Sequence, residues 1–350
     1  MTRDSRLGLL AVLVLGWLLP VTGTFAAELH PGYVGSTACA ECHADQHAAW
    51  TGSHHDLAMQ LATAETVLGN FDDAGFKLDG VTTRFFRDGD RFMVRTQGAD
   101  GGTADFVVHY VFGIDPLQQL LLELPGGRLQ AFGVAWDARP EGQGGQRWYH
   151  LYPDDPPRPG DRLHWSAPDQ NWNHMCAECH STDLLKLYDA ASDSYATSYA
   201  EIDVGCEACH GPAAGHVTWA RQPVRDADPR LAILLDERKG VSWRPDPASG
   251  QPRRSMPHTN TKEIGTCARC HSRRGRLTES YRHGAQVGNS PRVATLTPGL
   301  SQPDGQVLDE VYVYGSFLQS RMYAAGGTCS DCHQPHTFKW RADGAAPCAA

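Results

Sequence analysis

The sequence predicts an α+β chain that is loop-rich and mainly short-helical, with one antiparallel β module between the first and second copies of a repeated motif. Three observations support this fold class. The 350 residues include 36 glycines and 22 prolines, a composition typical of loop-rich folds rather than helical bundles. A pentapeptide of the form C-x-x-C-H occurs five times. The long gap between the first two copies is rich in β-branched and aromatic residues.

The first 26 residues are typical of a cleaved signal peptide. Arg3 and Arg6 precede an apolar run over residues 7–19, which is too short to span a bilayer as a helix. We expect cleavage after Ala26, a periplasmic or otherwise exported mature chain, and no membrane span in that chain. An uncleaved membrane anchor is the alternative.

The formal net charge of -9 argues against nucleic acid as a partner, because nucleic-acid binders carry a basic surface.

The repeated pentapeptide is the attachment signature of c-type haem. Two thiols one helical turn apart can each bond one vinyl group of a porphyrin, and the adjacent histidine then binds the iron. Zinc ribbons, redox dithiols and disulfides also use paired cysteines, but none of them requires a histidine after the second cysteine five times. We therefore expect five covalently attached haem c groups. Their attachment cysteines are Cys39 and Cys42, Cys176 and Cys179, Cys206 and Cys209, Cys267 and Cys270, and Cys329 and Cys332; their proximal ligands are His43, His180, His210, His271 and His333.

Residues 27–75 form the first haem-binding segment, and residues 76–155 are predicted to form the antiparallel β module. Strand-like runs cover residues 81–86, 91–95 and 106–112, and residues 88–90 and 99–102 between them have the composition of hairpin turns. Residues 117–124 fit a short helix or a buried strand. Two more strand-like runs cover residues 128–136 and 146–152.

Residues 156–350 carry the other four motifs, and we expect short helices at residues 184–188, 215–221 and 310–323. Porphyrins would supply much of the apolar core that such loop-rich sequence lacks. Cys348 stands outside the five motifs and near the end of the sequence. It fits the start of a sixth haem motif, so that the chain is truncated within it; a free thiol on a frayed tail is the alternative.

Twelve histidines outside the motifs are available as second axial ligands. A histidine a few residues past its own motif cannot pass round the edge of its own porphyrin, so it should serve a neighbouring haem. His55, His216 and His336 are the first candidates, because each follows a motif closely, and we expect His55 on a helix. His150 and His164, which flank the proline-rich stretch before the second motif, are the next. The reserves are His54, His174, His258 and His283, whereas His30, His47 and His109 are not expected to be ligands.

A basic segment stands out in this acidic protein. Residues 253–292 contain nine lysines or arginines and two acidic residues. Arg269, Arg273, Arg274 and Arg276 are candidates to neutralise haem propionates or to dock an acidic partner. A solvated, arginine-rich loop is the alternative.

Three segments resemble the cytochrome c-554-type multihaem family: residues 33–39, the Trp50-x-x-Ser53-x-His55 element, and residues 206–212. Residues 126–130, 146–150 and 311–317 are more closely similar to exported multihaem cytochromes that carry C-terminal tetratricopeptide repeats, which are absent from this chain. The resemblance implies stacked haems, each with two histidine ligands, and electron transfer as the activity.

We therefore expect a periplasmic multihaem c-type cytochrome that exchanges electrons with redox partner proteins through five mostly bis-histidine haems. An oxidoreductase acting on a small nitrogen or sulfur compound is the alternative, and it would need an iron with an open sixth position. Related nitrite reductases often have lysine in place of the motif histidine at that haem, and all five motifs here end in histidine. A second alternative is the haem domain of a larger repeat-containing binding protein.

Overall fold

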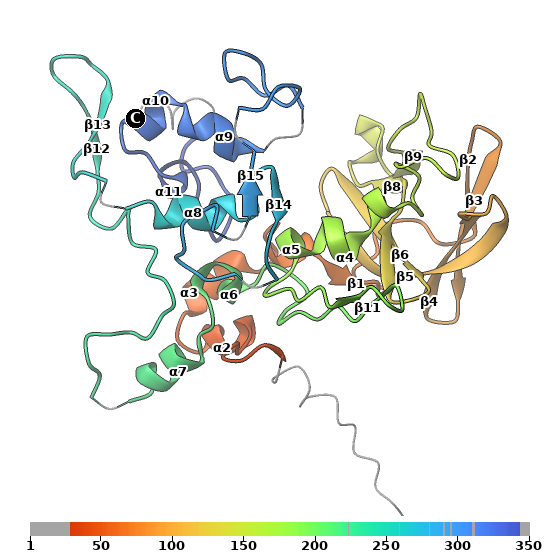
Figure 1. The fold of residues 1–350 in the computed structure, drawn as a ribbon, viewed down its shortest axis with the longest axis horizontal. Helices are drawn as coiled ribbons and strands as arrows, with labels where there is room; N and C mark the ends of the chain where they lie inside the picture. The colour runs from red at the N-terminus through yellow and green to blue at the C-terminus, as the bar shows by residue number, and fades with distance from the viewer. Residues whose placement is uncertain are drawn as a thin grey trace, which may run out of the picture.

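The computed structural model describes residues 29–222, 224–258, 260–279, 281–289, 291–294, 296–309 and 312–343. The predicted signal peptide and Cys348 lie outside these ranges. Within them, no helix combines the length and apolar character needed to cross a membrane. The chain has two parts, a β module and a loop-rich region of short helices that carries the motifs (Figure 1).

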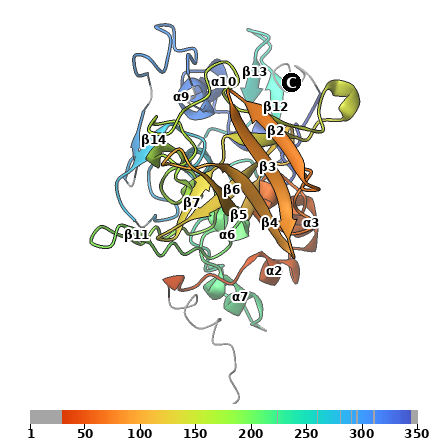
Figure 2. The ribbon, with the colours of Figure 1, turned by 90° about the vertical axis from the view of Figure 1, so that its right-hand side faces the viewer.

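The β module is a nine-stranded sheet in which all pairings are antiparallel. Its main path runs β2-β3-β4-β5-β6-β8-β9, while β1 pairs with β5 and β7 with β6. The sheet curls so that its edge strands β2 and β9 come into contact. Figure 2 views the module from the side on which β2, β3 and β4 lie. The strands are β1 (Gln60–Leu61), β2 (Ala74–Leu78), β3 (Val81–Asp88), β4 (Arg91–Gln97), β5 (Thr103–Phe112), β6 (Leu117–Leu124), β7 (Arg128–Ala131), β8 (Val134–Asp137) and β9 (Arg147–His150).

The predicted antiparallel sheet is confirmed, and the ambiguous run at residues 117–124 is a strand. The run at residues 128–136 divides into β7 and β8 at Phe132 and Gly133. Strand β2 was not expected. Its signal was the pair Asp79-Gly80, which takes positive φ at both residues and closes the two-residue turn between β2 and β3.

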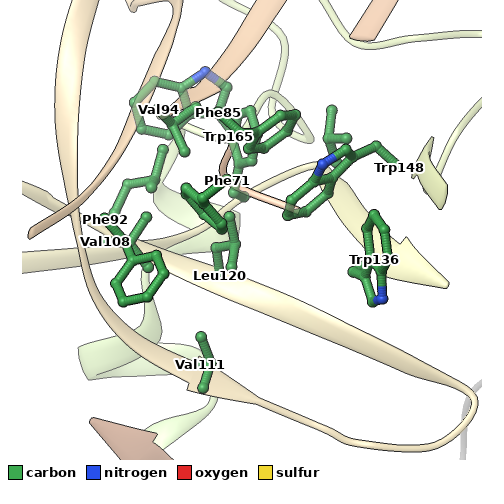
Figure 3. Packing of buried hydrophobic residues seen from close by; sticks show 13 residues of the cluster. Phe71, Phe85, Phe92, Val94, Val108, Val111, Leu120, Trp136, Trp148 and Trp165 are labelled. Atoms are coloured by element: carbon green, nitrogen blue, oxygen red, sulfur yellow. The ribbon is translucent and has the colours of Figure 1, made fainter. Parts of the chain in front are cut away.

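An aromatic core fills the inside of the β module (Figure 3). Phe85 is fully buried and stacks on Trp148 with 3.7 Å between ring centroids and 3° between ring planes. Phe71 meets both rings edge-on. Gly69 lies against the same indole, and a Cβ there would come within 2.4 Å of a Trp148 ring carbon, so this position requires glycine.

A second apolar cluster joins the β module to the second motif. Met59 and Leu121 contribute from the module side, and Trp172, Ala177 and Leu184 from the segment around the motif; all five are buried. Cys176 packs against this cluster. Because the apolar contact is continuous, the sheet fixes the position of the second motif.

The motif-bearing region consists of short helices and three two-stranded hairpins. The helices are α2 (Ser36–Ala40), α3 (Ala44–Trp50), α4 (Trp172–Met175), α5 (Ala177–His180), α6 (Cys206–His210), α7 (Ala214–Ala220), α8 (Lys262–Ala268), α9 (Val313–Leu318), α10 (Arg321–Ala324) and α11 (Cys329–Cys332). The hairpins pair β10 (Tyr188–Asp189) with β11 (Ser194–Tyr195), β12 (Trp243–Pro245) with β13 (Pro252–Arg254), and β14 (Arg274–Arg276) with β15 (Pro291–Val293).

The helix predictions had three outcomes. The helix expected at residues 215–221 is α7. The one expected at residues 310–323 is present as α9 and α10, which Ser320 separates as the N-cap of α10. The helix expected at residues 184–188 is wrong, because Leu185 bridges to Ser198 and Tyr188 belongs to β10. The segment buries Leu184 in the second cluster, and this tertiary contact outweighs its helix propensity.

We predict that Phe85→Ala lowers the free energy of unfolding of the β module by about 3–5 kcal/mol, because it removes a fully buried ring and leaves a cavity against Trp148. Phe86→Ala is the matched control: its ring lies on the other face of β3, partly exposed beside Arg84 and Arg95, and we expect about 1 kcal/mol or less. Urea unfolding followed by circular dichroism measures both. Equal losses would contradict this description of the core.

Candidate haem attachment sites

Each C-x-x-C-H motif lies on or directly beside a short helix: α2, α5, α6, α8 and α11 in chain order. One helical turn separates the two cysteines of a motif, as thioether attachment to one porphyrin edge requires. The ten thiols form no disulfide. In the described part of the chain, no three cysteine, histidine or acidic side chains gather as ligands for a bare metal ion.

Thiols from different motifs meet in three pairs. The Cys39 and Cys206 thiols are hydrogen-bonded, which joins the first motif to the third. Such contacts also join the second motif to the fourth and the fourth to the fifth. These contacts are made by Cys179 with Cys270 and by Cys267 with Cys329. Arg269 of the fourth motif also reaches the third motif, where it donates to the Ala208 carbonyl oxygen at 3.4 Å. The fourth motif therefore adjoins the second, third and fifth.

A buried carboxylate fastens the third motif to the first. Glu207 is only 1% exposed, and its oxygens accept backbone N–H bonds from Val34 at 2.9 Å, Gly35 at 2.8 Å and Ala213 at 2.7 Å. Burial raises the pKa of Glu207, and the three N–H donors oppose that rise. The residues that lead into α2 are thereby held against α6.

A second carboxylate completes this junction. Glu201 accepts hydrogen bonds from the Ser36 backbone N–H at 2.7 Å and the Ser36 hydroxyl at 2.9 Å. The Ser36 oxygen in turn accepts from the Cys206 N–H at 2.9 Å, so one serine serves the first turns of α2 and α6. Gly205 is required beside them, because a Cβ there would lie 2.0 Å from a Glu201 oxygen.

Carboxylates also fasten the other two pairs of motifs. Glu263 of α8 is buried and accepts from the Ser330 N–H at 2.6 Å and its hydroxyl at 2.8 Å, within the first turn of α11. Glu178 of the second motif pairs with Arg274, just beyond the fourth motif, at 2.9 Å. Arg274 also lies 3.5 Å from the Cys179 sulfur. The same motifs are thus joined by thiol contacts and by charged groups.

Arg274 and Arg276 of the basic segment are not exposed, unlike the arginines of a solvated loop. Their side chains are only 7% and 17% exposed, and Glu178 lies within 4 Å of both. Arg269 is buried with its guanidinium 4.3 Å from the centre of the Tyr281 ring. These three arginines join protein segments, so a solvated loop does not describe them; their role towards haem propionates or an acidic partner stays a prediction.

His43 of the first motif faces His216, with ring centroids 6.0 Å apart and 24° between ring planes. Bonds between imidazole nitrogen and a transition metal are about 2 Å long, so two imidazoles on opposite sides of one metal have ring centres about 6 Å apart. His216 Nδ1 lies 2.7 Å from the Pro229 carbonyl oxygen. That hydrogen bond places the proton on Nδ1 and leaves the Nε2 lone pair for a metal.

His55 and His336 also come near the histidines of other motifs. His55, beyond the first motif, lies 6.4 Å from His271 of the fourth. Burial and His271 lower the pKa of His55 to about 3. His336, beyond the fifth motif, neighbours His210 of the third, whose pKa burial and His336 lower to about 4. Both pKa values keep these side chains neutral near pH 7, and the neutral imidazole is the form that binds a metal. His55 is not on a helix, because α3 ends at Trp50.

The proximal histidines of the second and fifth motifs have different neighbours. His180 Nδ1 lies 3.2 Å from the Ala58 carbonyl oxygen, which again leaves Nε2 for a metal, and its nearest ring is Phe112, edge-on at 5.9 Å. The ring of His333 lies 4.2 Å from that of Trp340. In the part of the chain that the structure describes, no second imidazole makes a ring contact with either.

The structure does not bring His150 and His164 to a motif. His150 is the last residue of β9, and His164 is close enough to His150 for the two side chains to interact electrostatically. His150 Nδ1 accepts from the Tyr152 N–H at 3.0 Å, and a Cβ on Gly133 would lie 3.3 Å from its Nε2. His164 Nδ1 lies 2.8 Å from the Ser166 hydroxyl. A short helix at residues 168–170 and helix α4 separate His164 from the second motif. Closeness in sequence therefore does not place these rings beside that motif.

Sequence reasoning missed the acidic residues that join the motifs. Glu178 and Glu207 stand inside their motifs, between the two cysteines, where a carboxylate facing solvent would be ordinary. Their burial depends on which motif lies alongside, and no local pattern records that. His30, which the sequence did not predict to be an iron ligand, has both ring nitrogens in hydrogen bonds: they lie 2.9 Å from Asp183 and 2.8 Å from Ser198.

Two comparisons with known proteins bear on this arrangement. The sequence model of a family described as cytochrome c554 and c-prime matches residues 38–73 and 161–211. The matched segments contain the first three motifs, and the unmatched stretch between them holds strands β2 to β9. A search of the curated proteins found no match.

Among solved structures, the chain is similar to the crystal structure of the outer cell wall cytochrome OcwA, with a TM-score of 0.52 and 18% sequence identity. The match covers 89% of this chain and 58% of that one, so this chain spans less than two thirds of its neighbour's length. At this identity the likeness is one of fold. The family match independently supports c-type haem attachment by the segments that it covers. The finer resemblance to cytochromes with tetratricopeptide repeats stays a prediction.

We predict that Glu207→Ala lowers the free energy of unfolding by about 3 kcal/mol, because three backbone N–H groups beside the first and third motifs lose a charged acceptor. Glu41→Ala is the control, since Glu41 stands inside the first motif and makes only an exposed ion pair with Arg221. We expect less than about 1 kcal/mol there. Urea titration of the haem-loaded protein measures the free energy of unfolding of both variants. An unchanged free energy of unfolding in Glu207→Ala would refute the junction.

Proposed function

We propose that this chain is an exported multihaem c-type cytochrome that holds five haem c groups and passes single electrons between redox proteins of the periplasm. The observation that carries the proposal is that two motif histidines lie at a metal-bridging separation from a histidine that follows another motif: the ring centroids are 6.0 Å apart for His43 and His216 and 6.4 Å apart for His271 and His55. Paired imidazoles at this separation are what six-coordinate haem irons require. His336 is close enough to His210 to lower its pKa, which supports a third pair.

The residues present fit this cofactor. Two thioether bonds from each motif would hold the porphyrin, and the motif histidine would bind the iron. When bound, haem c supplies one-electron redox chemistry. His216, His55 and His336 would supply the second imidazole for the first, fourth and third motifs. With both axial positions taken by imidazoles, no position is left for a substrate, and this favours electron transfer over chemical conversion at these three motifs.

The contacts between motifs give the proposed path. The first motif adjoins the third, the third adjoins the fourth, and the fourth adjoins the second and fifth. The five sites therefore form one continuous group that branches at the fourth motif. Electrons entering at the first, second or fifth motif could reach the other ends without leaving the protein.

Export of the chain is part of the proposal. The amino-terminal pattern of Arg3, Arg6 and the apolar run supports a signal peptide cleaved after Ala26. The structural neighbour is an outer cell wall cytochrome, which is consistent with a location outside the cytoplasm. The partners we propose are soluble or surface redox proteins of that compartment.

A second candidate function is reaction of a small nitrogen or sulfur compound at the second motif. All seventeen histidines fall within the described ranges, and none makes a ring contact with His180. His55 is close enough to feel His180 electrostatically, but it faces His271. An iron held there without a second imidazole would have an open position for a small ligand.

We predict that the 350-residue protein, expressed with haem-attachment machinery, gains the mass of five haems over the mature polypeptide. Cys206→Ser with Cys209→Ser should lose one haem and keep four. Cys348→Ser is the matched control, because this cysteine stands outside the five motifs, and it should keep all five. Intact mass and the pyridine haemochrome assay measure the count, and a mass equal to that of the bare polypeptide would refute the proposal.

We also predict that the reduced protein binds one or two carbon monoxide molecules per chain, because neither His180 of the second motif nor His333 of the fifth makes a ring contact with a second imidazole. Optical titration measures the stoichiometry. Absence of binding would remove the second candidate function and leave electron transfer intact. Binding of several molecules would mean that the imidazole pairs do not saturate their irons, and this would weaken the electron-transfer proposal.

A further inference from the structure

Among the histidines outside the motifs, His258 is the one whose Nε2 is buried without a hydrogen-bond partner. Burying a ring nitrogen without a partner costs about 1–3 kcal/mol, so native structures rarely keep one without a reason. A metal bond is such a reason, because the Nε2 lone pair of a neutral imidazole is then used.

The surroundings of His258 place it beside the fifth motif. A Cβ built on Gly326 would lie 3.5 Å from the Cβ of His258, so the two backbones are packed together. Cys329, the first thiol of the fifth motif, follows Gly326 by three residues. His333 of that motif makes no ring contact with a second imidazole in the described ranges, as its ring neighbour is Trp340.

The backbone on the amino-terminal side of His258 is held in place. Arg254 donates to the Met256 carbonyl oxygen at 2.8 Å and to the Pro257 carbonyl oxygen at 3.2 Å. Pro257 restricts its own φ angle. A ring carried on such a segment has few orientations, as a metal ligand needs.

Other free histidines are engaged elsewhere. His283 Nε2 lies 3.3 Å from the Ala208 carbonyl oxygen, and His174 Nδ1 lies 3.4 Å from the Lys186 ammonium. His54 is exposed, and His150 and His164 lie on the β module. The engagement of these other histidines and the position of His258 beside the fifth motif therefore both favour His258.

We propose that His258 is the second axial ligand of the iron held by the fifth motif. The inference rests on the proposed function, since it requires that the fifth motif binds haem. It makes the fifth site six-coordinate and leaves the second motif as the site without a second imidazole.

The test uses His258→Gly in the full, haem-loaded chain, with His283→Gly as the control. The haem count is measured first and should remain five in both, because neither residue attaches haem. Low-temperature electron paramagnetic resonance should then show one more high-spin haem in the His258 variant and no change in the control. Added imidazole should restore the low-spin signal, which a purely structural role would not explain.

Two further variants make the assignment specific. His258→Met should keep the haem low-spin and raise the reduction potential of one haem, because a thioether ligand raises it relative to imidazole. In a chain that carries Cys329→Ser and Cys332→Ser, and so lacks the fifth haem, His258→Gly should add no high-spin haem.

Three outcomes would overturn the inference: an unchanged spin state in His258→Gly, a loss of low-spin signal that imidazole does not restore, or a new high-spin haem in the chain without the fifth motif's thiols. A haem count below five in the unmodified protein would instead contradict the proposed function. The two failures are therefore distinguishable.

Discussion

Carboxylates that bond the first turns of neighbouring motif segments are the interaction on which the haem-binding region depends. The motif helices have four to seven residues, too few to be stable alone, and their first N–H groups have no partner within the helix. Glu207, Glu201 and Glu263 accept those N–H groups from another motif's segment. These bonds stabilise the helix starts of α2 and α11 when the neighbouring motif segment is in place, and they join the motifs that adjoin.

The β module has a different role, because it contributes apolar burial rather than charged contacts. Its aromatic core is closed around Phe85 and Trp148, and its second face packs against the segment of the second motif through Trp172 and Ala177. The family match skips strands β2 to β9, and the flanking matched segments meet in space although the module separates them in sequence. The module is thus an insertion that leaves the contact between the first and third motifs intact.

The imidazole pairs follow from the same cross-motif packing. A histidine close behind a motif is confined by its short tether to one side of its own site, so it can meet only a histidine that another motif brings near. His216 meets His43 because α6 and α2 are held together by Glu207, and His55 meets His271 across the junction of several motifs. The second motif packs on the sheet and not between two haem segments, which explains why Phe112 is its nearest ring.

The sequence by itself determined what is local: the attachment pentapeptides, the turn chemistry, and the alternation that predicts the antiparallel sheet. Covalent spacing and hairpin geometry act over a few residues, so these features are readable without a fold. Tertiary structure alone decided that residues 184–188 are extended, that Glu207 is buried and Glu178 pairs with Arg274, that His150 lies in β9, and that the nitrogen of His258 is enclosed beside Gly326. The reason is physical: a side chain's burial and partners depend on segments tens to more than a hundred residues away, and identical C-x-x-C-H motifs do not specify which of them will pack together.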